Sequence, residues 1–161
     1  MITQPSESSV TEQIPMTRRA SILIADDEPR IRLTLRSCLE AEGYDVEEAR
    51  DGAEAIRAII DARPDLVLLD LAMPHLDGIA MLRELRVRFP DITPRVIVLT
   101  AWGTPVVKEE AFMLGVCDFL KKPIVPSVLR TVVARVFSAK HPPSPADDAD
   151  EDSPFGHLFL G

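Results

Sequence analysis

The chain has 161 residues, of which 46% are apolar and 27% are charged, a composition typical of a soluble globular protein with one ordinary domain. The net charge of −8, without any basic cluster, argues against a nucleic-acid-binding surface. No apolar run approaches the roughly 20 residues of a membrane helix, and the N-terminal region lacks the pattern of a secretion signal, so we expect a cytoplasmic protein without a membrane span.

The two ends of the chain differ in composition from its middle. Residues 1–19 are polar and contain two prolines, which predicts a disordered N-terminal lead. Residues 139–161 form an acidic, proline-rich tail, which also predicts disorder. The tail ends in a short segment with four apolar residues, Phe155, Leu158, Phe159 and Leu160. We expect residues 20–138 to fold as one domain, and the apolar segment is a candidate docking element.

Two strand-helix units follow the lead. A continuous apolar run at 22–25 predicts a strand that is buried on both faces. A helix then begins at Pro29, a favoured first helical residue, and ends at Gly43. Its apolar face carries Ile31, Leu35, Cys38 and Leu39. Residues 44–49 alternate between apolar and acidic side chains, as an edge strand does, and a second helix covers 52–62.

Three further strand-helix units complete the middle of the chain. Strands are expected at 66–69, 96–99 and 117–121. The helix after the first of these is capped by Asp77, and the remaining helices cover 105–114 and 126–138. Five such units in one domain predict an α/β fold, a parallel sheet with helices on both faces.

Polar side chains stand where the predicted strands end. They are Asp26, Asp27, Asp70, Thr100 and one of the adjacent lysines Lys121 and Lys122. Because the carboxyl ends of parallel strands meet at one edge of the sheet, we expect these groups to lie together. Carboxylates in this number suit Mg²⁺, and an ionised carboxylate can attack a phosphoryl group. The sequence therefore predicts a Mg²⁺-dependent phosphoryl acceptor, with Asp70 as the attacking group.

Four segments of the chain resemble the receiver domain of two-component response regulators: ILIADDEPRIR, LVLLDLAMPHLDG, VIVLTA and DFLKKP. The resemblance covers about residues 20–137 and implies a flavodoxin-like, doubly wound sheet of five parallel strands in the order 2-1-3-4-5, with five helices. It implies a stand-alone regulator that accepts a phosphoryl group from a histidine kinase or a phosphotransfer protein. The output would be a protein contact through residues 104–138, a face through which receivers also form homodimers. Such a protein is a self-catalysed acceptor and not an enzyme.

The resemblance also implies a role for each residue of the predicted site. Asp70 would accept the phosphoryl group, and Asp27, Asp70 and the backbone carbonyl of Ala72 would bind Mg²⁺ directly. Asp26 would act on the metal through water. The family lysine directly precedes a proline, so Lys122 rather than Lys121 would contact the phosphoryl oxygens, and the Lys122–Pro123 peptide bond would be cis.

Further residues are implied in signalling and in the lifetime of the phosphoryl group. Thr100 would move to hydrogen-bond the phosphoryl group, together with the backbone N–H of Ala101, and Phe119 would turn inward. Ala72 and Trp102 would line the pocket, where neither readily positions an attacking water, so we expect slow self-dephosphorylation.

Several other functions remain to be distinguished. The chain would also fit an adaptor that works without phosphorylation, or an intermediate that passes the phosphoryl group onward in a phosphorelay. A haloacid-dehalogenase-type phosphatase also uses an aspartyl nucleophile, but here Ala72 stands where that family has its second carboxylate. A Rossmann nucleotide site is disfavoured because no Gly-x-Gly-x-x-Gly motif follows the first strand.

Overall fold

The computed structural model describes residues 18–101 and 105–139, and within them strands and helices alternate. The five strands are β1 (Ser21–Ala25), β2 (Asp45–Ala49), β3 (Leu66–Asp70), β4 (Arg95–Thr100) and β5 (Val116–Lys121). The five helices are α1 (Pro29–Ala41), α2 (Gly52–Ala62), α3 (Gly78–Arg88), α4 (Pro105–Met113) and α5 (Pro126–Ser138). Each predicted element is present, with boundaries that differ by a residue or two.

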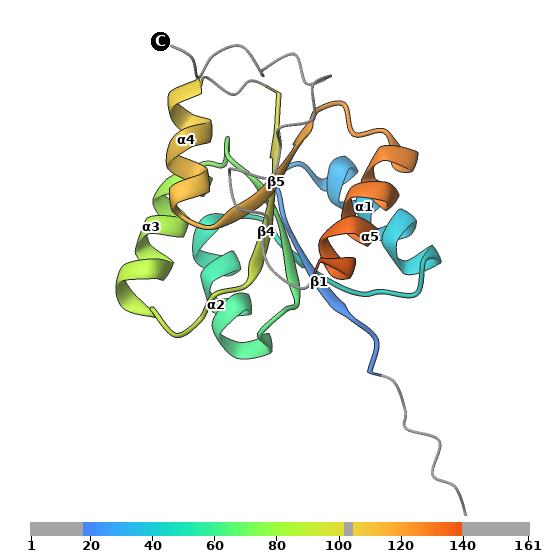
Figure 1. Ribbon diagram of the computed structural model, residues 1–161, viewed down its shortest axis with the longest axis horizontal. Helices are drawn as coiled ribbons and strands as arrows, with labels where there is room; N and C mark the ends of the chain where they lie inside the picture. Colours follow the sequence, from blue (N-terminus) through green and yellow to red (C-terminus); the bar gives the residue numbers. More distant parts are fainter. Residues whose placement is uncertain (1–17, 102–104, 140–161) are drawn as a thin grey trace, which may run out of the picture.

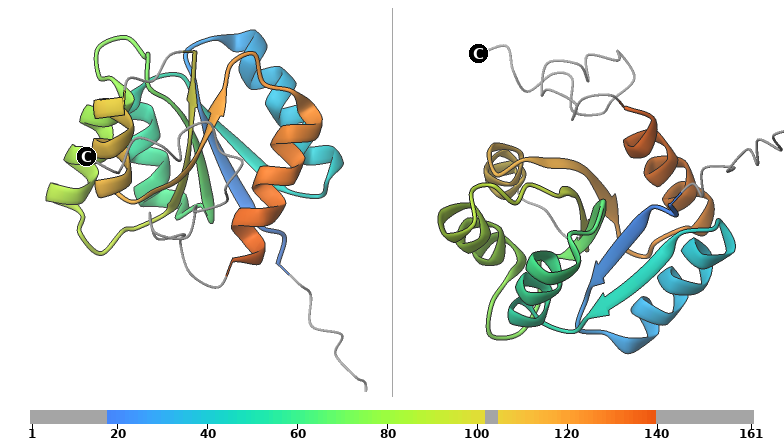
Figure 2. Two further views of the ribbon diagram at one scale, coloured as in Figure 1. Left: turned by 45° about the horizontal axis from the view of Figure 1, so that its top comes forward. Right: turned by 90° about the horizontal axis from the view of Figure 1, so that it is seen from below.

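The strands form one parallel sheet in the order β2-β1-β3-β4-β5. Helices α1 and α5 cover one face of the sheet, and α2, α3 and α4 cover the other (Figures 1 and 2). The predicted doubly wound fold and its strand order are confirmed. In this topology the carboxyl ends of β1, β3 and β4 are neighbours, which is where the sequence placed the polar residues.

The central strands are apolar throughout because each of their faces packs against helices. In β3, Val67 and Leu69 belong to the core shared with α2, α3 and α4, whereas Leu66 and Leu68 belong to the core shared with α1 and α5. All four side chains are fully buried. A strand with water on one face would alternate between apolar and polar residues, so the continuous runs follow from this two-sided packing.

The edge strand begins one residue later than predicted. Tyr44 does not enter the ladder with β1, since its amide donates to the Leu39 carbonyl at the end of α1 (3.2 Å). The ring of Tyr44 stacks on Phe137 of α5, with 5.3 Å between the centroids. Tyr44 therefore belongs to the packing of α1 against α5, and β2 starts at Asp45.

The residues predicted to end and to cap helices do so. Gly43 follows α1 with a φ of 90°, a left-handed conformation that glycine adopts without steric cost. The Asp77 side chain accepts a hydrogen bond from the Ala80 amide (2.8 Å) at the start of α3. Among the described helices, none combines the length and the apolar character needed to cross a membrane.

Candidate functional site

Three of the predicted polar residues are buried side by side where the strands end. Asp26 follows β1, Asp70 is the last residue of β3, and Thr100 is the last residue of β4. Their exposed fractions are only 0%, 4% and 8%. The neighbouring Asp27 is exposed and completes the acidic group at the surface. The structure thus brings the predicted carboxylates and the threonine to one edge of the sheet.

The three carboxylates have the arrangement of a metal site. Asp26, Asp27 and Asp70 each offer an oxygen, and these oxygens lie within 4.8 Å of one another. Hard oxygen donors of this kind fit Mg²⁺. Burial raises the pKa of Asp70, and the charge of Asp26 raises it further, against the opposing effects of the Ala72 amide and Lys122. A divalent cation at this position would favour the ionised form of Asp70.

Of the two candidate lysines, Lys122 lies at the carboxylates. Its Nζ is 2.8 Å from Asp26 Oδ2 and 3.2 Å from Asp70 Oδ2. Burial alone would lower the pKa of Lys122, but its contacts with Asp26 and Asp70 outweigh this and raise it. Lys121 is exposed and pairs with Thr100 in the ladder, as the last residue of β5. The Lys122–Pro123 peptide bond is cis.

Two residues after β3 lie close to Asp70: Ala72 contacts its side chain, and Gly78 lies against its backbone. The Ala72 amide donates a hydrogen bond to Asp70 Oδ1 (3.0 Å), and Ala72 itself is exposed. A Cβ on Gly78 would lie 2.7 Å from the Asp70 carbonyl oxygen and 3.0 Å from Leu71 Cα. Position 78 is therefore restricted to glycine by contact with the backbone of Asp70 and Leu71. The sequence analysis missed this residue, for which the only local signal is a glycine at the start of a helix.

The residues predicted to act in switching lie on adjacent strands. Phe119 of β5 pairs with Val98 of β4, two residues before Thr100. The Phe119 ring is partly buried against Phe112 of α4 in an edge-to-face contact, with 5.1 Å between centroids and 70° between planes. Lys108 Nζ lies 5.7 Å from the centroid of the same ring. Phe119 thus contacts α4 directly, as a residue that couples the site to this helix must do.

Ala101 is exposed directly after β4. The predicted pocket residue Trp102 and the apolar segment Phe155, Leu158, Phe159 and Leu160 lie outside the described residues, as do residues 1–17.

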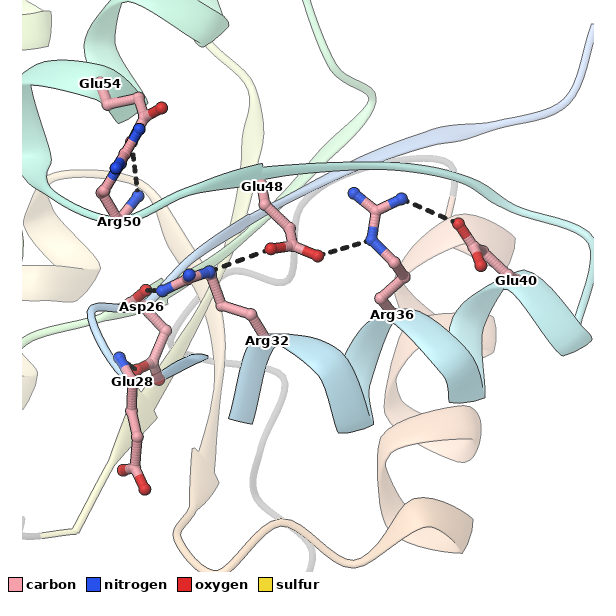
Figure 3. A network of polar contacts seen from close by, with 8 residues as sticks. All are labelled: Asp26, Glu28, Arg32, Arg36, Glu40, Glu48, Arg50 and Glu54. Carbon is pink, nitrogen blue, oxygen red and sulfur yellow. Dashed lines mark hydrogen bonds and ion pairs between the residues drawn. The ribbon is translucent and has the colours of Figure 1, made fainter. Parts of the chain in front are cut away.

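A polar network beside the site was not predicted (Figure 3). Glu48 of β2 accepts hydrogen bonds from Arg32 Nε (3.0 Å) and from Arg36 Nε (2.6 Å), both on α1. Arg32 also donates from Nη1 to the backbone carbonyl of Asp26 (2.8 Å). The available sequence signal was two arginines four residues apart on one helix, together with an acid on the strand that follows it.

Comparison with known proteins gives one consistent result. A family model described as the response regulator receiver domain matches residues 22–134. The transcriptional regulatory protein ResD of Bacillus subtilis is 44% identical over 120 residues, which are 74% of this chain and 48% of ResD. The response regulator MprA of Mycobacterium avium is 37% identical over 129 residues, which are 80% of this chain and 54% of MprA. The chain spans about half the length of the curated relatives it matches.

Solved structures agree with the sequence relatives. The chemotaxis protein CheY4 of Vibrio cholerae superposes with a TM-score of 0.69 at 31% identity, covering 74% of this chain and 99% of CheY4. The signal receiver domain of a signal transduction histidine kinase from Syntrophus aciditrophicus superposes with a TM-score of 0.66 at 36% identity, covering 78% of this chain and 96% of that structure.

Proposed function

The chain belongs to the response regulator receiver domain family, and from this premise we propose that it accepts a phosphoryl group on Asp70 in a Mg²⁺-dependent reaction. One observation carries the proposal. The buried carboxylate of Asp70 lies within 4.8 Å of two further carboxylates and 3.2 Å from a lysine ammonium. Such a constellation supplies a nucleophile, ligands for a hard cation and a positive charge for the phosphoryl oxygens. The donor would be a histidine kinase or a phosphotransfer protein.

The transfer follows from the chemistry of the residues. An oxygen of Asp70 forms a bond to phosphorus while the bond between phosphorus and the donor atom breaks. The electron pair of that bond leaves with the donor, on an imidazole nitrogen in a phosphohistidine or an oxygen in acetyl phosphate. Lys122 neutralises charge on the phosphoryl oxygens, and the Thr100 hydroxyl and the Ala101 amide donate hydrogen bonds to these oxygens in the product. Mg²⁺ held by Asp27, Asp70 and the Ala72 carbonyl, with Asp26 acting through water, would neutralise the remaining charge.

The signal would leave the domain through a protein contact on residues 104–138. Within residues 18–101 and 105–139, six large hydrophobic side chains are exposed, and four of them lie in this range: Val106, Met113, Val125 and Val128. Val106 and Met113 lie on α4, whereas Val125 and Val128 lie at the start of α5. Exposed apolar side chains on these two helices would favour protein contacts. Phe119 contacts Phe112 of α4 and would carry a movement at the end of β4 to this helix. The same face could form a homodimer. Alternatively, the phosphoryl group would pass onward to another protein in a phosphorelay.

The phosphoryl group should be lost slowly. Ala72 offers no side chain that positions an attacking water, and the same holds for Trp102 in the sequence. The domain is thus proposed as an acceptor that is used once per signal and not as an enzyme with turnover. A phosphoprotein half-life of seconds after removal of the donor would contradict slow loss.

A second output, transcriptional control, is favoured by the 44% identity to the transcriptional regulatory protein ResD. In that case the 161 residues would work within a longer protein, and the contact face would act on an attached domain. The mass of the native protein isolated from its source decides between the two. A mass equal to that of these residues supports a stand-alone regulator, and a mass about twice as large supports the second output.

The test of the proposal is the intact mass of the protein after incubation with acetyl phosphate. We expect the mass of one phosphoryl group to be gained with Mg²⁺, and no gain with a chelator or in Asp70→Asn. No gain in any condition, from a folded protein, would refute the proposal and favour the phosphorylation-independent adaptor. Continuous release of phosphate from simple esters would favour a phosphatase.

A further inference from the structure

Arg32 joins three elements at the edge of the acidic site. It lies in the first turns of α1, and its side chain is only 14% exposed. From there Nη1 donates to the Asp26 carbonyl oxygen (2.8 Å), and Nε donates to Glu48 Oε2 on β2 (3.0 Å). Figure 3 shows the guanidinium lying between these two acceptors. One side chain thus ties α1 and β2 to the residue that follows β1.

The peptide that Arg32 contacts is the one that joins two of the three acidic residues. The Asp26 carbonyl and the Asp27 amide belong to one planar peptide group. A hydrogen bond that fixes the carbonyl therefore also fixes the position of the Asp27 Cα atom. The other groups of Asp26 are held as well. Its amide donates to Ala49 (3.1 Å), and its carboxylate accepts from the Glu28 amide (2.9 Å) and from Lys122 (2.8 Å).

Asp27 depends on this backbone contact. Its side chain is exposed, and across residues 18–101 and 105–139 no hydrogen bond or ion pair holds its carboxylate. The position of that carboxylate is consequently set by the main chain, and Arg32 is the side chain that fixes the main chain just before it.

Glu48 keeps the Arg32 guanidinium in place. It is bound on its other oxygen by Arg36 Nε (2.6 Å), and Arg36 also contacts Glu40 (3.0 Å). Burial alone would raise the pKa of Glu48, but the hydrogen bonds from Arg36 and Arg32 lower it. Glu48 therefore stays ionised at neutral pH, and its ion pair with Arg32 is present under the conditions in which Mg²⁺ would bind.

We propose that Arg32 is a positioning residue for the divalent cation, because it fixes the Asp26–Asp27 peptide and through it the Asp27 carboxylate. This inference rests on the proposed metal site and adds a residue to it from outside the acidic cluster. Partners that orient metal ligands commonly contribute 10-fold or more to metal affinity.

The chain offers a matched control for this role. Arg36 shares the acceptor Glu48 with Arg32 and lies on the same helix, and its replacement also removes an ion pair. Among the described residues, however, its side chain contacts Glu48 and Glu40 and not Asp26. A purely structural role in holding α1 on β2 would make Arg32→Met and Arg36→Met equivalent. A positioning role would affect Mg²⁺ binding in Arg32→Met alone.

The experiment is a calorimetric titration of Mg²⁺ into wild type, Arg32→Met, Arg32→Lys and Arg36→Met, with the folded fraction of each checked by urea unfolding. We expect the Mg²⁺ dissociation constant to rise about 10-fold in Arg32→Met and less than about twofold in Arg36→Met. Arg32→Lys should fall between them, because one ammonium replaces a forked donor.

A second measurement is independent of the metal. The amide of Glu28, which donates to the Asp26 carboxylate (2.9 Å), should exchange its hydrogen faster in Arg32→Met than in Arg36→Met, without added Mg²⁺. Equal Mg²⁺ affinity of wild type and Arg32→Met, or equal weakening in both methionine variants, would overturn the inference while leaving the metal site intact. Failure of the wild type to bind Mg²⁺ would overturn the metal site, and this inference with it.

Discussion

Gly78→Ala tests how closely the start of α3 is fitted to the end of β3, where Asp70 lies. Gly78 is buried as the first residue of α3, and its amide donates to the Leu71 carbonyl (3.1 Å). An added Cβ would meet the Asp70 carbonyl oxygen at 2.7 Å, and Leu71 Cα and Cδ2 at 3.0 Å. The atoms met are mostly backbone, which cannot move aside by a change of rotamer.

Two opposing effects decide the sign of the change. Alanine is favoured over glycine in a helix by about 1 kcal/mol, whereas overpacking a tight site costs about 1–3 kcal/mol. Ordinary contacts begin near 3.4 Å, so the 2.7 Å approach requires a shift of about 0.7 Å between α3 and the end of β3. We therefore expect Gly78→Ala to lower the free energy of unfolding by about 1–2 kcal/mol and to slow phosphorylation by displacing Asp70.

Urea unfolding gives the stability change, and the rate of mass gain from acetyl phosphate with Mg²⁺ gives the effect on the site. The matched control is Gly52→Ala, also at the start of a helix, whose Cβ would meet the Leu76 carbonyl at 2.9 Å and otherwise its flexible side chain. We expect a smaller loss of stability there and a normal phosphorylation rate. A Gly78→Ala protein as stable as the wild type, with the same rate, would refute the steric argument.

Three further predictions follow from the site, the network and the core. Mg²⁺ at 100 times its dissociation constant should raise the free energy of unfolding by about 2.7 kcal/mol. Asp27→Asn should need more Mg²⁺ for the same gain. Urea unfolding with and without Mg²⁺ measures this, and an unchanged free energy of unfolding in the wild type would contradict both predictions. The lowered pKa of Glu48 contributes stability that is present above its ordinary value of 4.5 and is lost as the pH falls through the lower native value. Unfolding measured across this acid range should therefore be less pH-dependent in Glu48→Gln, and identical slopes would be evidence against the contribution. Ile59→Ala, at a fully buried position against the sheet, should lower the free energy of unfolding by about 2–5 kcal/mol and Ile60→Ala, partly buried, by less; equal losses would contradict the packing described.

The fold was predictable from the sequence because its signals are local. A strand such as β3 is apolar on both faces, so the continuous apolar run at 66–69 favours a strand covered by helices on both sides. Helix limits were marked by Gly43 and Asp77, whose conformation and capping depend only on nearby backbone. Tyr44 was misplaced because its true partner, Phe137, is distant in the sequence.

The site was predictable only where strand ends determine position. Asp26, Asp70 and Thr100 stand at the ends of neighbouring strands, so the topology alone brings them together. The choice of Lys122 over Lys121 needed the family resemblance, because strand periodicity does not fix a residue in the loop beyond the strand. Arg32 was missed for a related reason, since its partners come from two other elements and only the packed structure reveals them.

The most direct test of the central claim is to locate the phosphoryl group chemically. Borohydride reduces an acyl phosphate to an alcohol, which converts a phosphorylated aspartate into homoserine and leaves free carboxylates unchanged. After treatment with acetyl phosphate and Mg²⁺, followed by borohydride and peptide mass mapping, the account predicts homoserine at position 70 and at no other aspartate. Homoserine at Asp26 or Asp27 instead, or none in a folded protein that binds Mg²⁺, would contradict it.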